Sequence, residues 1–166
     1  MKNKKQESGR SMIEMVGVLA VMGLITAAAF VLITSAMRSQ KLSRVDDDIA
    51  ALAAGVRLLY NNSADNGGFK GIVTATSDNT LKVLGFDNVK PAYGSDTKYT
   101  ITAVKSIANN TITNCAATDN DCPYFSISFT TDSNNTCSGL AQRTWANGGV
   151  SSCNGATLRI VFYDGK

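Results

Sequence analysis

A single uncharged stretch near the N-terminus constrains this chain more than any other feature of its sequence. From Met15 to Met37 the chain runs for 23 residues without one charged side chain. As a helix this apolar segment would be about 34 Å long, enough to cross the hydrocarbon core of a bilayer. A secretory signal has a shorter apolar region of roughly 7–15 residues, although Thr34-Ser35-Ala36 would pass as its cleavage site. A buried core helix of this composition is uncommon, so we expect a retained membrane helix.

Basic residues flank the apolar segment on both sides. They weakly favour a topology in which the short N-terminal leader stays inside and the larger body is exported. The four basic residues before the segment are Lys2, Lys4, Lys5 and Arg10, and the three that follow it are Arg38, Lys41 and Arg44.

The helical pattern does not stop where the apolar segment ends. No proline interrupts the chain between Met12 and Tyr60, and apolar residues recur at spacings of three and four beyond Arg38. The sequence therefore predicts one helix of about 50 residues. Its N-terminal half would protrude, and its second half would pack on a globular body through Leu42, Val45, Ile49, Leu52, Val56 and Leu59.

Residues 61–166, which we call the head, are rich in Asn, Thr, Ser and Gly. Alternating β-formers predict strands over 98–104, 124–130 and 157–163, with a weaker candidate over 107–113. We expect 61–80 to be a loop, 81–84 a helical turn or strand, and 140–145 a helical turn. Short polar links between the strands favour an antiparallel sheet, covered by the amphipathic part of the helix. The predicted fold class is α+β.

Composition narrows the possible functions of the 166 residues. The chain contains no histidine, which excludes histidine-dependent hydrolysis and His-ligated metal sites. A net charge of +3 is too small to predict a nucleic-acid binder. Asp119 and Asp121 superficially suggest a calcium loop, but the EF-hand pattern is missing and a solvated acidic turn is the better interpretation. We expect neither an enzyme nor a cofactor or metal site.

Four cysteines lie in the head, and four thiols allow three disulfide pairings. The nearest-neighbour scheme joins Cys115 to Cys122 and Cys137 to Cys153. Disulfides would require an oxidising compartment, which agrees with a body outside the cytoplasmic membrane.

The start of the chain resembles a known family. Gly9-Arg10-Ser11-Met12-Ile13-Glu14-Met15-Val16, with the apolar run through Ala36, looks like the N-terminus of type IV pilins and pseudopilins. The resemblance implies a prepilin that a membrane aspartic peptidase cuts after Gly9. Arg10 would become the first mature residue and Glu14 the fifth.

The resemblance also implies an organisation along the chain. Residues 1–9 would be the leader, 10–37 the transmembrane and filament-core helix, 38–60 its amphipathic continuation, and 61–166 a disulfide-containing pilin head. This chain departs from the family at Arg10, because the first mature residue there is usually apolar and N-methylated.

The function implied by the resemblance is assembly. After cleavage the helix would leave the bacterial inner membrane and pack with copies of itself in an extracellular pilus, with Glu14 neutralising the amino end of a neighbouring subunit at Arg10. Its partners would be other copies, the prepilin peptidase, the inner-membrane assembly machinery and, before assembly, lipid. Two alternatives remain: a pseudopilin of type II secretion in the periplasm, or a signal-anchored extracytoplasmic binding protein that never polymerises.

Overall fold

The computed structural model describes residues 4–60, 68–94, 97–108, 111–145 and 149–163, with the side chains of 4–11 and 74–75 outside this description. The chain divides into two compact units, Met1–Gln40 and Lys41–Lys166. We call the second the globular unit. Each unit is described by itself.

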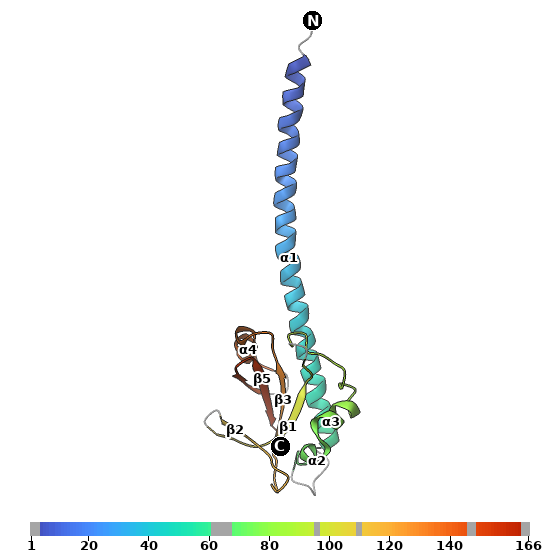
Figure 1. Cartoon of the computed structure of the whole chain (residues 1–166), viewed down its shortest axis with the longest axis vertical. Coiled ribbons are helices and arrows are strands. Elements are labelled where there is room, and N and C mark those ends of the chain that lie inside the picture. Colours follow the sequence, from blue (N-terminus) through green and yellow to red (C-terminus); the bar gives the residue numbers. More distant parts are fainter. Residues whose placement is uncertain (1–3, 61–67, 95–96, 109–110, 146–148, 164–166) are drawn as a thin grey trace. The chain divides into compact units, whose positions relative to one another are not determined.

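Helix α1 runs from Lys4 to Tyr60 without interruption (Figure 1). The predicted continuity of the helix is therefore confirmed. Within the globular unit, Val45, Ile49, Leu52 and Val56 are fully buried, whereas Leu42 is half-buried and Leu59 is 39% exposed. The predicted stripe thus forms the packing face, except at its last member.

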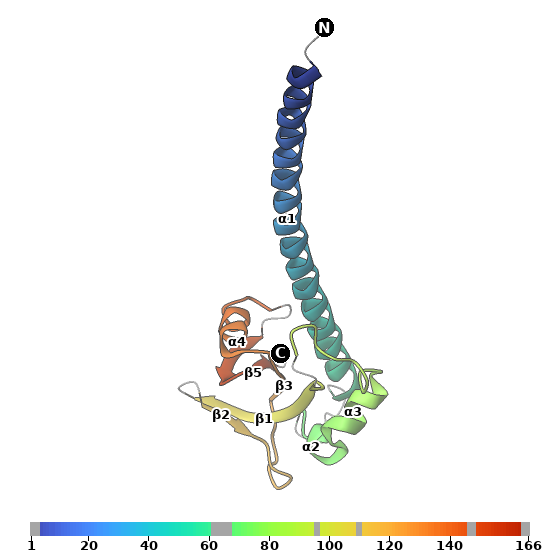
Figure 2. The same ribbon diagram turned by 45° about the horizontal axis from the view of Figure 1, so that its top comes forward.

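The sheet of the globular unit is antiparallel throughout and has the strand order β2-β1-β3-β5-β4. The strands are β1 (Thr100–Ala108), β2 (Thr111–Asn114), β3 (Tyr124–Thr130), β4 (Val150–Asn154) and β5 (Thr157–Tyr163). Together with α1 they give the predicted α+β fold. Strand pairing shifts register between Val104 and Ser106, which marks a bulge that bends β1, and Figure 2 shows the resulting curl.

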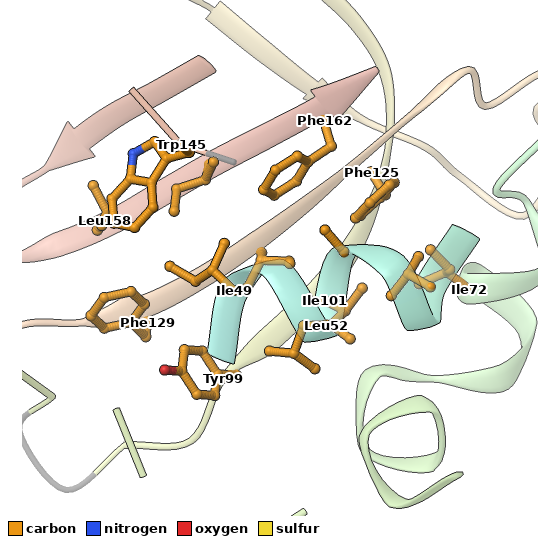
Figure 3. Close-up of a cluster of buried hydrophobic side chains, with 14 of the residues drawn as sticks. Ile49, Leu52, Ile72, Tyr99, Ile101, Phe125, Phe129, Trp145, Leu158 and Phe162 are labelled. Carbon is orange, nitrogen blue, oxygen red and sulfur yellow. The ribbon is translucent and has the colours of Figure 1, made fainter. Parts of the chain in front are cut away.

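One face of the sheet and the second half of α1 form a single hydrophobic core (Figure 3). Alternate residues of β1, β3 and β5 point into it because successive side chains of a strand face opposite sides. Phe125 stacks on Phe162 with ring centroids 5.3 Å apart, and Tyr99 meets Phe129 edge-on at 5.5 Å. The buried sheet residues are Ile101, Ala103, Phe125, Ile127, Phe129, Leu158, Ile160 and Phe162.

The structure corrects several sequence-based expectations. The expected loop at 61–80 was wrong where it is described, because α2 (Gly71–Ala75) and α3 (Ser77–Val83) occupy it; 61–67 lie outside the described residues. Packing overrides weak helix propensity here, since Ile72 and Leu81 are buried in the core. The segment at 81–84 is the end of α3 rather than a strand.

Further corrections concern the C-terminal part. The helix near residue 140 is α4, Asn134–Ala141, which begins earlier than expected because the Ser133 side chain caps it by accepting from the Thr136 N–H. Strand β1 extends to Ala108, and the weaker candidate at 107–113 is divided between β1 and β2. Strand β4 was not predicted. Strands β3 and β5 have the predicted bounds.

Candidate functional site

The apolar part of α1 is exposed along its whole described length. Every residue from Met12 to Lys41 is exposed, including large side chains such as Leu19, Ile25 and Phe30. The most apolar window of this helix has a mean hydropathy of 2.6, and 0% of it is buried. By length and composition the helix is sufficient to cross a membrane. Exposed apolar surface of this extent requires lipid or protein to cover it.

One face of this helix carries a shallow groove that begins at Glu14. Its other lining residues are Gly17, Val18, Val21, Met22 and Ile25, which recur at spacings of three and one. Gly17 contributes no side chain to the groove, and an added Cβ there would meet no described atom within 4 Å. Small residues at such positions let another helix approach closely. Among the described residues that line the groove, Glu14 alone is ionisable.

The hydroxyl groups of two threonines within the apolar segment are satisfied by the helix itself. Thr26 Oγ1 donates to the Met22 carbonyl at 2.7 Å, and Thr34 Oγ1 donates to the Val31 carbonyl at 2.9 Å. Neither hydroxyl therefore needs water or a protein partner, which makes this surface compatible with lipid.

Glu14 lies on α1 with an exposed side chain at the N-terminal end of the apolar segment. Among the residues whose side chains are described, no cation lies within ion-pair distance of it. Gly9 and Arg10 also belong to α1, but their side-chain positions lie outside the described residues. The structure thus places the expected cleavage and assembly residues on one continuous helix.

The cysteines of the globular unit form Cys115–Cys122 and Cys137–Cys153, the nearest-neighbour pairing. The first bridge closes the loop between β2 and β3, and the second joins α4 to β4. Both bridges therefore lie within the globular unit.

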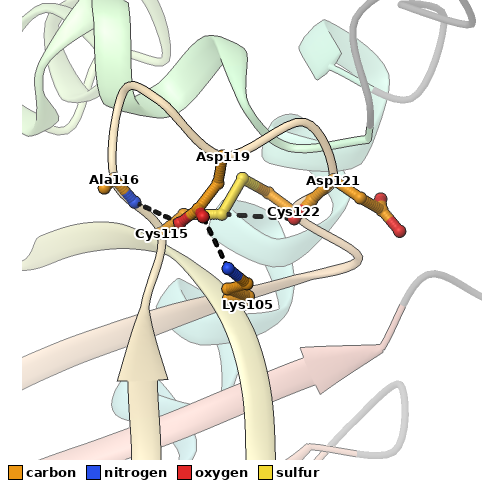
Figure 4. Close-up of polar contacts among 6 residues, drawn as sticks. All are labelled: Lys105, Cys115, Ala116, Asp119, Asp121 and Cys122. Atoms are coloured by element: carbon orange, nitrogen blue, oxygen red, sulfur yellow. Dashed lines mark hydrogen bonds and ion pairs between the residues drawn. A yellow bond between two sulfur atoms is a disulfide. The ribbon is translucent and has the colours of Figure 1, made fainter.

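The acidic loop inside the first bridge is a largely exposed turn in which Asp119 is held by two hydrogen bonds. Asp119 accepts hydrogen bonds from the Ala116 N–H at 2.8 Å and from Lys105 Nζ at 2.6 Å (Figure 4). The backbone hydrogen bond, followed by that of Lys105, lowers the pKa of Asp119. Figure 4 shows the Asp121 carboxylate pointing away from Asp119, and no cluster of metal-ligating side chains occurs among the described residues.

Sequence reasoning missed one polar centre in the globular unit. Arg159 lies in the middle of β5, on the sheet face opposite the core, and lines an open hollow with small hydroxyl and amide side chains. The available signal was a lone arginine between Leu158 and Ile160 in a strand that is otherwise apolar or aromatic. The strand was predicted, but no role was assigned to this residue.

No protein-family model, curated protein or solved structure matches this chain.

Proposed function

We propose that this chain is a structural subunit of a type IV pilus, made as a prepilin and polymerised through its N-terminal helix. The observation that carries the proposal is the exposed apolar surface of α1 with Glu14 at its head. A surface of this kind must be covered first by lipid and then by other copies. The resemblance of residues 9–16 to pilin N-termini supplies the order of these events.

The proposed role of Glu14 is electrostatic. An ionised carboxylate within a bilayer costs about 2.5–3.5 kcal/mol on insertion scales, so an isolated glutamate there is unfavourable. The free amino group at Arg10 of a neighbouring mature subunit would offset this cost. In the dry interior of a filament such a pair is strengthened, and an incorrect axial position is penalised because it leaves a charge unpaired.

The proposed processing step has a direct test. Purified mature protein is sequenced from its N-terminus, or its intact mass is measured. Cleavage after Gly9 predicts a chain that begins at Arg10, with or without an added methyl group. A chain that begins at Met37 would instead establish a secretory signal and overturn the proposal.

The assembly step is tested in the source cells by electron microscopy of sheared surface material, labelled with an antibody against this chain. Wild type is expected in filaments. Glu14→Ala is expected to remain inserted and cleaved but absent from filaments. The matched control is Asp47→Ala, which also removes one carboxylate from the same helix, at an exposed position of the globular unit.

Two outcomes of this experiment favour the alternatives. Wild-type protein that is never found in filaments would indicate an anchored binding protein. Filaments confined to the periplasm would indicate a pseudopilin. Normal surface filaments from Glu14→Ala would remove the proposed role of that residue.

A further inference from the structure

The face of the sheet that turns away from the core contains an open hollow of about 650 Å³. Small-molecule sites in proteins commonly have volumes of about 300–1,000 Å³. All five strands contribute to the wall, which is dominated by hydroxyl and amide side chains. The described lining residues are Thr102, Thr111, Ile112, Asn114, Ser128, Ser152, Cys153, Asn154, Thr157 and Arg159.

Arg159 lines this hollow and links three strands of its wall. Its Nε donates to Ser126 Oγ on β3 at 3.0 Å, and its Nη2 donates to Asn114 Oδ1 on β2. In sheet order β2 is three strands away from β5, and neighbouring strands are about 4.8 Å apart. An arginine side chain is much shorter than three such spacings, so the sheet must be curled around it. The hollow is therefore concave, with a guanidinium at its base.

The room around this guanidinium is left open by small neighbours. The strand register places Ser128 of β3 and Ser152 of β4 directly opposite Arg159 on either side. Two of the five N–H donors of a guanidinium are used by Asn114 and Ser126, which leaves three for a ligand. Within the described lining no residue is acidic, so the wall offers no counter-charge. Partial burial lowers the pKa of Arg159, and an anion would relieve that cost.

A second hollow of about 320 Å³ lies beside the first on the same sheet face. Its wall combines Ile107, Val150 and Val161 with Ser151. It shares Ile112, Ser152 and Cys153 with the polar hollow. The β1 bulge creates this change in character, because the register shift beyond Val104 brings Ile107 opposite Ile112. A ligand that spans both hollows would place a charged group beside hydroxyls and an apolar surface beside isoleucine and valine.

We propose that this concave face binds an anionic saccharide, whose acidic group rests on Arg159. A guanidinium holds a carboxylate or sulfate through paired N–H donors. The hydroxyl and amide groups of the wall match sugar hydroxyls, and the isoleucine and valine side chains of the second hollow suit the C–H face of a ring. No aromatic residue is found among the described lining residues, which disfavours nucleic acid because single-stranded bases bind by stacking on aromatic rings.

The test uses the full chain in polyoxyethylene detergent micelles, since glycoside detergents would themselves present a sugar. Titration calorimetry is run with a uronate-containing hyaluronan disaccharide, a sulfated heparin disaccharide, neutral lactose and a short oligothymidylate. At least one acidic disaccharide is expected to bind, at least about tenfold more tightly than lactose, and to weaken with added salt. Comparison of the uronate and the sulfate then identifies the preferred anion.

Variants assign the binding to Arg159. Arg159→Gln is expected to weaken the acidic disaccharide by about tenfold or more, because it removes charge-assisted hydrogen bonds. Arg159→Lys retains the positive charge but loses the paired N–H donors of the guanidinium. Its affinity for the acidic disaccharide should therefore be intermediate. Lys82→Gln is the matched control, since it removes one positive charge at an exposed position of α3 that does not line the hollow.

Arg159 also fixes neighbouring strands, so a second variant protects the test from loss of folding. Ser128→Asp leaves Arg159 in place but puts a carboxylate directly opposite it. This variant should keep its buried Trp145 fluorescence and lose saccharide binding. The proposal is overturned if neither acidic disaccharide binds at millimolar concentration, if lactose binds equally well, if oligothymidylate binds more tightly, or if both variants bind like wild type. Binding is measured on the monomer, so the result is independent of filament assembly.

Discussion

Within helix α1, the residues from Met12 to Lys41 are the most apolar of the chain and are exposed, whereas residues 42–60 are more polar and include fully buried side chains. Total hydrophobicity therefore does not decide which part of this helix enters the core. The decisive feature is arrangement: residues 42–60 gather their apolar side chains on one face, while the apolar segment is apolar all round. The first arrangement suits one protein surface, and the second requires partners on every side.

The two parts also treat charge differently. In the globular unit, charged residues of α1 bind other elements of that unit. Asp48 accepts from the Tyr99 hydroxyl at 3.0 Å, and Asp46 pairs with Arg143 at 3.0 Å. Arg57 lies 5.9 Å from the Phe125 ring centroid and donates to the Tyr163 carbonyl. Glu14 is exposed on an apolar surface, so its environment depends on what covers that surface.

The largest difference between the two parts of α1 is expected when one leucine in each part is replaced by alanine. Leu52→Ala removes a fully buried side chain and should lower the free energy of unfolding of the globular unit by about 2–5 kcal/mol. Leu24 is 74% exposed, so Leu24→Ala should leave the free energy of unfolding of the globular unit unchanged. Denaturant unfolding in detergent, followed by fluorescence of the single tryptophan, measures both. Equal losses would show that the exposed part contributes to the core.

A charge scan tests the same contrast from the membrane side. Leu24→Lys should make membrane insertion less favourable by about 3 kcal/mol, because it places an ammonium group near the middle of the apolar segment. Leu58→Lys is the control, since Leu58 is 79% exposed in the globular unit. Insertion is measured by carbonate extraction of membranes. An equal effect of the two substitutions would contradict a membrane role specific to the apolar segment.

A smaller effect is expected at the contact between α1 and the residue that precedes β1. Desolvation, and then the Asp48 carboxylate, raise the pKa of Tyr99 above its ordinary value near 10. The unfolded chain would lose this proton above about pH 10 while the folded chain retains it. This contribution to stability is thus complete below pH 10 and falls by about 1.4 kcal/mol per pH unit above it.

Replacing Tyr99 by phenylalanine isolates the contribution of its ionisation to stability. Unfolding of Tyr99→Phe should show a shallower loss of stability above pH 10 than wild type, although the variant is less stable at neutral pH because Asp48 loses a donor. Identical slopes in the two proteins would show that Tyr99 ionises freely in the folded state.

The smallest effect is expected at Asp119, in the acidic loop between Cys115 and Cys122. Because its pKa is lowered, the Asp119 carboxylate stabilises the fold above its ordinary pKa near 3.9, and this contribution is lost as the pH falls further. Asp119→Asn should slightly reduce stability at neutral pH and flatten its acid dependence. Asp121→Asn serves as the control because its carboxylate points away from the loop contacts. Carboxyl NMR titration follows both.

Sequence patterns predicted the parts of the fold that have strong periodicity. The stripe from Leu42 to Val56 and the alternation in β3 and β5 identified the core, because burial on one face enforces these repeats. Strand β4 was missed because its sequence Val-Ser-Ser-Cys-Asn lacks clear alternation, and it forms by pairing with β5 alone. Helix α2 was missed because glycine and β-branched residues are poor helix formers.

The candidate functional sites also differ in how far the sequence alone could reveal them. The apolar segment and Glu14 are local features of the chain and could be identified from sequence. The hollow around Arg159 depends on the curl of the sheet, which brings β2 and β4 to one concavity although residues 115–149 separate them in the chain. No local pattern carries that information, so only the three-dimensional arrangement revealed the hollow.

The Cys137–Cys153 bridge should also protect the fold from aggregation. Strand β4 is a short edge strand, and the bridge ties it to α4. If β4 detached in a reduced chain, the backbone edge of β5, with its sequence Thr-Leu-Arg-Ile-Val-Phe-Tyr, would be open to pairing with other chains. Oxidation therefore does more than stabilise one molecule: it removes a template for disordered association from a protein whose proposed purpose is ordered association.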